Sequence, residues 1–281
     1  MRASVWGLGV SAILYGGWLL VHAVSGAGMP EMPEPPAAGS RLLGHPRCPS
    51  PPGTGFTFVL VEPGSFTMGS MLDPSERPRR EIRLSRPFCL ARTETTVAQW
   101  EAVMSGGVVD EQGSGRRAAS QLPKTGLSWD EAMDFVHAMN HRLGREACFL
   151  PTEAQWEYAA RAGSVGRYSF GDDPARLHHF GNCKSGRDPF PGLAPVGQLV
   201  PNHRGLVDMH GNATEWVADW YGPYDAAQSL DPQGPRHGTE KVRRGGSYRM
   251  SPDNCRCAAR TKAQPTTRRS DFGVRLACWA E

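Results

Sequence analysis

The sequence predicts an α+β domain with little regular secondary structure, made of hairpins, two main helices and long loops. The 281 residues include 33 Gly and 24 Pro, more than a helix-rich protein accommodates. Two segments carry helix-capping signals, and beyond residue 163 no long periodic segment occurs. Apolar residues at 39% and charged residues at 21% are typical of an ordinary globular domain. The chain beyond residue 163 should therefore consist mainly of long loops, which are uncommon in a compact domain unless metal ions or disulfides hold them.

The first half of the domain supplies the predicted strands. Residues 56–68 alternate apolar and polar side chains around Pro63 and Gly64, which predicts a hairpin. Residues 81–84 and 88–91 continue in the same strand-like pattern. Residues 96–104 then predict a short helix, because their apolar side chains recur at helical spacing.

Two further helices have clear starting signals. Ser128 and Glu131 form a capping box ahead of an apolar repeat that ends at Gly144. Thr152 and Gln155 have the same spacing, and the helix that they begin should stop before Gly163.

The N-terminus predicts export. Residues 5–24 contain no Asp, Glu, Lys or Arg, and Ala23 and Ser25 match the spacing of a signal-peptidase site. A retained membrane anchor is the alternative, since about 20 apolar residues cross a bilayer. We therefore assign residues 1–25 to a signal peptide or anchor, 26–54 to a Pro-rich linker and 55–281 to the folded domain. The domain is expected in the periplasm or outside the cell.

Charge and cysteine content limit the partners. A net charge of +3 with scattered Lys and Arg gives no footprint for nucleic acid, and contact with a membrane is expected only through the possible anchor. Seven cysteines in an exported chain can form disulfides, but an odd number leaves at least one thiol unpaired within the chain. Their connectivity cannot be read from the sequence.

Two loops concentrate oxygen ligands. Residues 208–215 place Asp208, Glu215 and an amide around Gly211, and Asn182 and Asp188 occur in a Gly- and Pro-rich stretch. Calcium takes six to eight oxygen ligands, so either loop has the right chemistry. Spacing alone favours ordinary hydrogen-bonded turns. Four histidines, at positions 178, 179, 203 and 210, form no acid–histidine spacing of a catalytic triad.

Several ordered segments resemble the formylglycine-generating enzyme, or sulfatase-modifying factor, family, from about residue 56 to the C-terminus. The matching segments are residues 64–70, 94–97, 127–132, 150–161, 194–197, 205–212, 215–216, 244–248 and 272–275. Such a series of motifs in order does not arise by chance. The resemblance implies the fold of this family, a complex C-type-lectin-like fold that is poor in regular secondary structure and held by two calcium ions.

The resemblance also implies which residues bind these ions. The first set is Asn182, the carbonyl of Cys183, Asp188 and the carbonyl of Phe190. The second set is Asp208, the carbonyls of Gly211 and Ala213, and Glu215. Calcium would be structural.

The oxidases of this family bind Cu(I) with two thiolates between their Gly-Gly-Ser-Tyr motif and a following Cys-Ala-Ala-Arg. Here that segment is shorter, neither catalytic cysteine has a counterpart, and only Cys255 and Cys257 are available as candidate catalytic residues. Their spacing permits copper in principle, but we do not expect it. The disulfide partners of the family are replaced as well, by Val136, Ala160 and Leu276, and Thr214 replaces an aromatic residue.

Three functions follow from the resemblance. The first is an exported accessory or maturation factor without oxidase chemistry, which binds a peptide segment of a periplasmic partner such as a nitrite reductase system. The second is oxidation of a siderophore chromophore, as in pyoverdine maturation, with Asp253, Glu215 and Arg260 as possible contributors. The third is formylglycine generation on sulfatases by Cys255 and Cys257.

Overall fold

The computed structural model describes residues 46–109, 120–184 and 189–281. The predicted signal peptide and most of the predicted linker lie outside these ranges. In the part of the chain that is described, no helix is both long and apolar enough to cross a bilayer.

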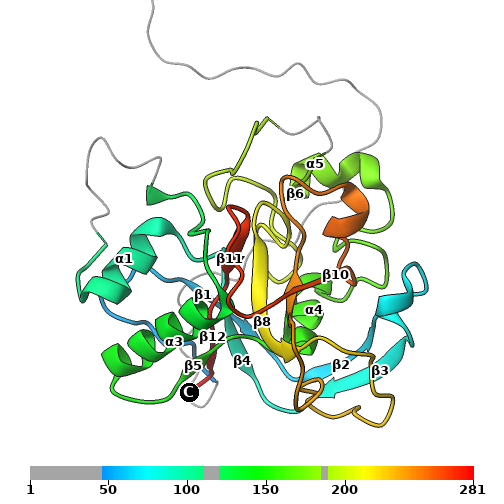
Figure 1. Cartoon of the computed structure of the whole chain (residues 1–281), viewed down its shortest axis with the longest axis horizontal. Coiled ribbons are helices and arrows are strands. Elements are labelled where there is room, and N and C mark those ends of the chain that lie inside the picture. Colours follow the sequence, from blue (N-terminus) through cyan, green and yellow to red (C-terminus); the bar gives the residue numbers. More distant parts are fainter. Residues whose placement is uncertain (1–45, 110–119, 185–188) are drawn as a thin grey trace, which may run out of the picture. The chain divides into compact units, whose positions relative to one another are not determined.

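Short strands and few helices make up the domain, as the glycine and proline content predicts (Figure 1). The strands are β1 (Phe58–Val61), β2 (Gly64–Met68), β3 (Arg80–Leu84), β4 (Phe88–Ala91), β5 (Cys148–Phe149), β6 (Gly181–Asn182), β7 (His210–Gly211), β8 (Thr214–Trp220), β9 (Lys241–Arg244), β10 (Arg260–Ala263), β11 (Phe272–Val274) and β12 (Ala277–Trp279). The helices are α1 (Val97–Ser105), α3 (Trp129–Leu143), α4 (Glu153–Arg161) and α5 (Leu177–Phe180), with 3₁₀ turns η1 (Pro74–Glu76), η2 (Pro174–Arg176) and η3 (Pro252–Cys255).

Two four-stranded sheets organise the strands. One has the order β1-β4-β12-β5, and the other has the order β10-β9-β8-β11, in which β11 runs parallel to β8. The pairs β2-β3 and β6-β7 form separate ladders. The predicted hairpin over residues 56–68 is wrong: both strands form, but β1 pairs with β4 and β2 pairs with β3. Strand pairing depends on partners far along the chain, which a local alternation cannot identify.

The predicted helices are confirmed. Thr96, Ser128 and Thr152 are the N-caps of α1, α3 and α4, and each forms a complete capping box. Gly144 ends α3 in the left-handed conformation at φ +67°. The helices α1 and α3 contact each other (Figure 1), and α3 buries Phe135 and Met139 completely. Each such side chain contributes about 1.5–3 kcal/mol to the free energy of unfolding.

Three disulfides link distant segments: Cys48–Cys89, Cys148–Cys278 and Cys183–Cys255. The second joins the neighbouring strands β5 and β12, and the first fastens the residues before β1 to β4. Arg47 also exchanges two backbone hydrogen bonds with Glu281, of 2.9 and 2.8 Å. Residues 46–54, which the sequence assigns to the linker, therefore pack on the folded domain.

Candidate functional site

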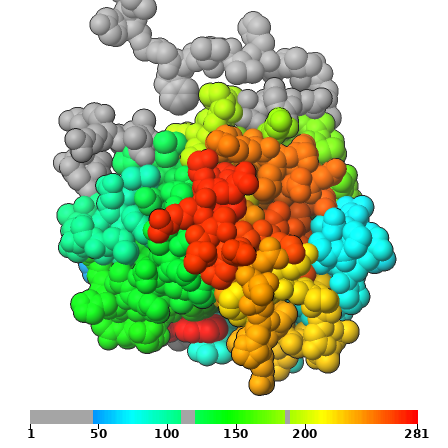
Figure 2. All heavy atoms as spheres, viewed as in Figure 1, coloured from blue at the N-terminus to red at the C-terminus, as the bar shows by residue number. Residues whose placement is uncertain are grey.

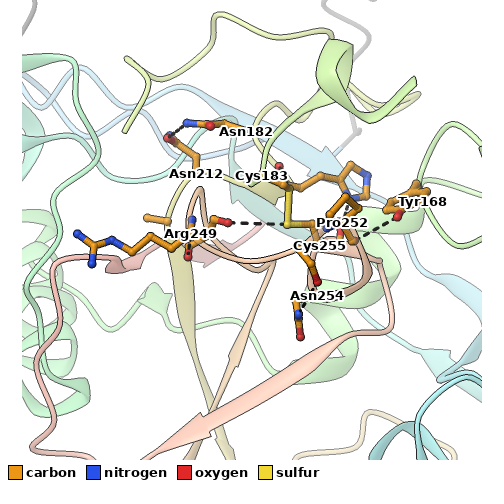
Figure 3. The surroundings of a disulfide bond; sticks show 12 residues. Tyr168, Asn182, Cys183, Asn212, Arg249, Pro252, Asn254 and Cys255 are labelled. Carbon is orange, nitrogen blue, oxygen red and sulfur yellow. Dashed lines mark hydrogen bonds between the residues drawn. A yellow bond between two sulfur atoms is a disulfide. The ribbon is translucent and has the colours of Figure 1, made fainter. Parts of the chain in front are cut away.

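One end of the third disulfide, Cys255, lies in the segment where the resemblance would place the reactive cysteines (Figure 3). Cys255 ends η3, and its sulfur is bonded to Cys183, directly after β6. Both residues are buried, with 0% and 2% of their surface exposed. The hydroxyl of Tyr168 donates a 3.1 Å hydrogen bond to the carbonyl of Pro252 and holds the start of this turn. The side chain of Arg249 points away from the disulfide.

Cys257 is the one cysteine without a disulfide, as the odd count requires. It is completely buried, and its backbone N–H donates to the carbonyl of Arg167. Burial raises the pKa of the Cys257 thiol to about 12. The thiolate is the form that binds metals and attacks electrophiles, so this thiol is held in its inert form. In the folded chain Cys255 is thus part of a disulfide, whereas Cys257 is a buried, protonated thiol.

His210 contacts the backbone of Cys255 and is buried and neutral. Its Nδ1–H donates to the carbonyl of Cys255 at 2.8 Å, and its Nε2 accepts from the backbone N–H of Ser169 at 3.2 Å. Burial lowers the pKa of the His210 imidazole to about 4. This histidine therefore stabilises the packing of the η3 turn.

The two loops that the sequence predicts to bind calcium lie next to each other. The strands β6 and β7 pair in parallel, which places Asn182 opposite Gly211. The Asn182 side chain donates to Oδ1 of Asn212 at 3.1 Å, as Figure 3 shows. A Cβ atom on Gly211 would lie 2.0 Å from the carbonyl oxygen of Asn182, and Gly211 has φ +89°. Only glycine permits this approach of the two loops.

Of the first calcium set, Asn182, Cys183 and Phe190 belong to the described residues, whereas Asp188 lies outside them. Of the second set, all four residues are described and buried. Within residues 46–109, 120–184 and 189–281, no three His, Cys, Asp or Glu side chains gather in the arrangement of a metal site. The second set would combine two carboxylates with main-chain carbonyls, which calcium accepts.

The two carboxylates of this second set, Asp208 and Glu215, lie in a buried cluster with Glu94 and Arg275. Glu215 forms an ion pair with Arg275 at 2.7 Å, and Glu94 accepts hydrogen bonds from the side chain of Asn212 and the backbone of Ala213, both at 2.7 Å. Burial, and then the charges of Asp208 and Glu215, raise the pKa of Glu94 well above its usual range. Burial also raises the pKa of Asp208 to about 6. Sequence reasoning missed Glu94, although it begins the 94–97 motif.

The charges of this cluster fit a divalent cation. Three carboxylates and one guanidinium carry a formal charge of −2 when all are ionised (−3 + 1). Asp208 accepts from the N–H of Gly197 with one oxygen, while its buried Oδ1 has no hydrogen-bond partner among the described residues. An unpaired buried carboxylate oxygen is costly unless a cation or donor satisfies it. Asp208 thus has one oxygen free for a cation, whereas both oxygens of Glu215 accept hydrogen bonds from Arg275 and Trp156.

Asp253, Glu215 and Arg260, the possible contributors to siderophore oxidation, each form an ion pair with a different residue. Asp253 is exposed and forms an ion pair with Arg167, whereas Arg260 is buried against Glu153 with an Nη2–Oε2 distance of 2.6 Å. Glu215 pairs with Arg275, as described above. Each already has its own ion-pair partner, so these three do not form a shared acid–base site.

A different acid lies beside the Gly-Gly-Ser-Tyr motif. Ser247 donates its hydroxyl to Oδ2 of Asp271 at 2.9 Å, and both residues are buried. The other carboxylate oxygen of Asp271 makes no hydrogen bond among the described residues, and Arg269 lies 3.7 Å from it. Asp271 is not among the residues that the sequence predicts for the site; its place directly before the 272–275 motif was the available signal.

The fold and the site define an irregular α+β domain in which disulfides and buried charges hold the loops. A family model described as "Sulfatase-modifying factor enzyme 1-like domain" matches residues 48–280. The chain therefore belongs to the sulfatase-modifying factor family, as the motifs predict.

Curated relatives include formylglycine-generating enzymes. The Bos taurus enzyme is 35% identical over 169 residues, covering 55% of this chain and 43% of that protein. The Streptomyces coelicolor enzyme is 35% identical over 173 residues, covering 55% of this chain and 52% of that protein. The chain thus spans about half the length of the curated relatives that it matches. Among solved structures, PvdO from Pseudomonas aeruginosa superposes with a TM-score of 0.70 at 25% identity, covering 79% of this chain and 94% of that one.

Proposed function

We propose that this chain is an exported accessory or maturation factor that binds a peptide segment of a periplasmic partner, for example of a nitrite reductase system, and has no copper–cysteine oxidase activity. One observation carries the proposal. The Cys255 sulfur is bonded to Cys183, and the Cys257 thiol is buried with a pKa of about 12. Binding of Cu(I) between two cysteines needs two thiolates that can reach one ion.

Calcium belongs to the same proposal as a structural ion. Asp208 and Glu215, with the carbonyls of Gly211 and Ala213, would hold one ion. Asn182 and Asp188, with the carbonyls of Cys183 and Phe190, would hold the other. When bound, calcium supplies positive charge that balances the buried carboxylates. Glu94 and Arg275 hold this loop through Ala213 and Glu215.

The oxidase chemistry can be tested directly. The purified chain, given Cu(I), oxygen and a peptide with the Cys-x-Pro-x-Arg sulfatase motif, should form no aldehyde, whereas the Streptomyces coelicolor formylglycine-generating enzyme serves as the positive control. Mass spectrometry detects the mass loss of the cysteine-to-formylglycine conversion. Aldehyde formation that disappears in a Cys255→Ser variant would contradict the proposal and make the third disulfide a reducible copper site.

A second candidate is oxidation of a siderophore chromophore without a cysteine pair, as in pyoverdine maturation. The observation that favours it is the Ser247–Asp271 pair beside the Gly-Gly-Ser-Tyr motif, because Asp271 is a carboxylate that could serve as a general base there, although Arg269 pairs with one of its oxygens. Deleting the gene separates the readings: immature nitrite reductase indicates the accessory factor, an immature siderophore indicates the oxidase, and inactive sulfatases indicate formylglycine generation.

A further inference from the structure

A cavity of about 480 Å³ lies between the β2–β3 hairpin, the turn after α4, Arg256 and Ala258. Neither the disulfide nor the calcium loops line it, although Arg256 and Ala258 are the neighbours of the buried Cys257 in the chain. In Figure 2, the loop of the hairpin (cyan) lies beside the segment near residue 250 (orange). Met71, Leu72 and Val165 line this cavity and are 58%, 58% and 91% exposed. Exposed apolar side chains around a hollow are typical of an interaction site.

Three arginines of the cavity hold its walls. Arg256 forms a bidentate ion pair with Glu76, with distances of 2.8 and 2.7 Å. Arg161 pairs with Glu157 at 2.7 Å, and Arg167 pairs with Asp253. Since each of these guanidinium groups already has a carboxylate, their charge is largely compensated. These three ion pairs connect the segments that line the cavity, and they leave little free positive charge there.

Two other arginines lack such a partner. Arg204 stacks on the ring of Tyr158, with its guanidinium carbon 4.5 Å from the ring centroid, and its buried Nε makes no hydrogen bond among the described residues. Arg79 is exposed and has no ion pair within the described chain. Both side chains line the cavity. An arginine that is stacked and otherwise unpaired is ready to bind a carboxylate through two N–H groups.

Carboxylates at the cavity restrict the ligand. Glu81 accepts a hydrogen bond from Thr67, and Asp172 accepts one from the backbone of Arg167. They would repel a polyanion, so this cavity is better suited to a ligand with isolated carboxylates and apolar groups. The cavity is open to solvent and is called the groove below. Its arginines and its exposed apolar side chains can both contact an extended peptide.

We propose that this groove binds a peptide segment of a partner protein in which an aspartate or glutamate lies next to a large apolar side chain. The carboxylate pairs with Arg204 and Arg79, and the apolar side chain packs on Met71, Leu72 and Val165. The inference rests on the proposed function, because it names the chemistry of the segment that the factor binds.

Fluorescence polarisation tests the groove on the full chain. The probe is a short fluorescein-labelled peptide in which aspartate alternates with leucine, and its counterparts carry lysine for aspartate or serine for leucine. Arg204→Gln and Val165→Glu should each weaken binding of the acidic, apolar probe by about tenfold. Arg86→Gln removes an arginine stacked on Trp279 at 4.2 Å, and Val108→Glu changes another exposed apolar residue; both should leave binding unchanged.

Each outcome decides the matter. Equal binding by the wild-type chain and both groove variants, or equal binding of the lysine counterpart, overturns the groove. A dimer that Val165→Glu dissociates in analytical ultracentrifugation assigns the surface to a second copy of the chain and also overturns it. If deleting the gene leaves the partner immature, and expressing the groove variants in the deletion strain restores maturation fully, the groove proposal is wrong but the proposed function stands. If the deletion affects no partner, the proposed function is wrong.

Discussion

At the scale of single residues, the domain is notable for buried charge. Arg244 is completely buried and pairs with both Glu157 and Glu153, and Arg260 shares Glu153. Breaking one partner of such a network leaves an uncompensated charge, which typically costs about 3–5 kcal/mol. These ion pairs join residues more than 80 positions apart, so they fix the relative placement of α4 and β9.

Asp219 provides a pH-dependent test within this network. It accepts from the backbone of Glu153 at 2.7 Å, and burial, followed by the charge of Glu153, raises its pKa to about 7 against the opposing effects of Arg260 and Lys241. An acid with a raised pKa binds its proton more tightly in the folded state. Stability therefore falls as pH rises from the ordinary value of 3.8 through about 7.

Asp219→Asn imitates the protonated acid and should remove this loss. Near pH 3.8 the variant and the wild type should be similar, and near pH 8 the variant should be more stable by on the order of 2 kcal/mol. Urea unfolding followed by circular dichroism measures the difference. Asp134→Asn, on the exposed face of α3, is the control and should not change the pH profile. A parallel pH profile for Asp219→Asn and wild type would contradict the assignment.

At the scale of elements, the capping box of α3 should contribute measurably. The Ser128 hydroxyl accepts from the N–H of Glu131 at 3.2 Å, and the Glu131 carboxylate accepts from the N–H of Ser128 at 2.9 Å. Ser128→Ala should lower the free energy of unfolding by about 1 kcal/mol, whereas Ser128→Thr keeps the acceptor and should cost only a few tenths. Equal losses in both variants, measured by urea unfolding, would show that the hydroxyl bond does not matter.

The elements also show what the sequence could and could not predict. All three long helices were predictable, because a capping box and an apolar repeat are local signals. The pairing of β1 with β4, and the position of the C-terminal β12 between β4 and β5, were not, because they join distant segments. The same reason hid Glu94 from the candidate site: its partners Asn212 and Ala213 are 118 and 119 positions away. The disulfide of Cys183 with Cys255 was one of many possible pairings.

At the scale of the whole molecule, long loops need constraints that a small amount of regular structure cannot supply. Disulfides provide part of them, since a link that closes a loop of 72 or 130 residues restricts the unfolded chain strongly. The loop of residues 208–215 is held instead by buried polar contacts to Glu94 and Arg275. Its carboxylates repel one another without a cation, so the stability of the entire domain should depend on calcium.

Removing calcium should therefore lower the melting temperature of the whole domain, because an ion that binds only the folded state stabilises it by mass action. At a free calcium concentration a hundredfold above Kd, the gain in the free energy of unfolding is about 2.7 kcal/mol.

Asp208→Asn gives a sharper test of the calcium site. In calcium the variant should melt below the wild type, because it loses a charged ligand. In chelator it should melt above the wild type, because it loses one of three mutually repelling buried carboxylates. Elemental analysis should find calcium in the wild type. A melting curve that is unaffected by chelator, with no calcium bound, would contradict the prediction, and so would an Asp208→Asn variant whose rank relative to wild type is the same in both conditions.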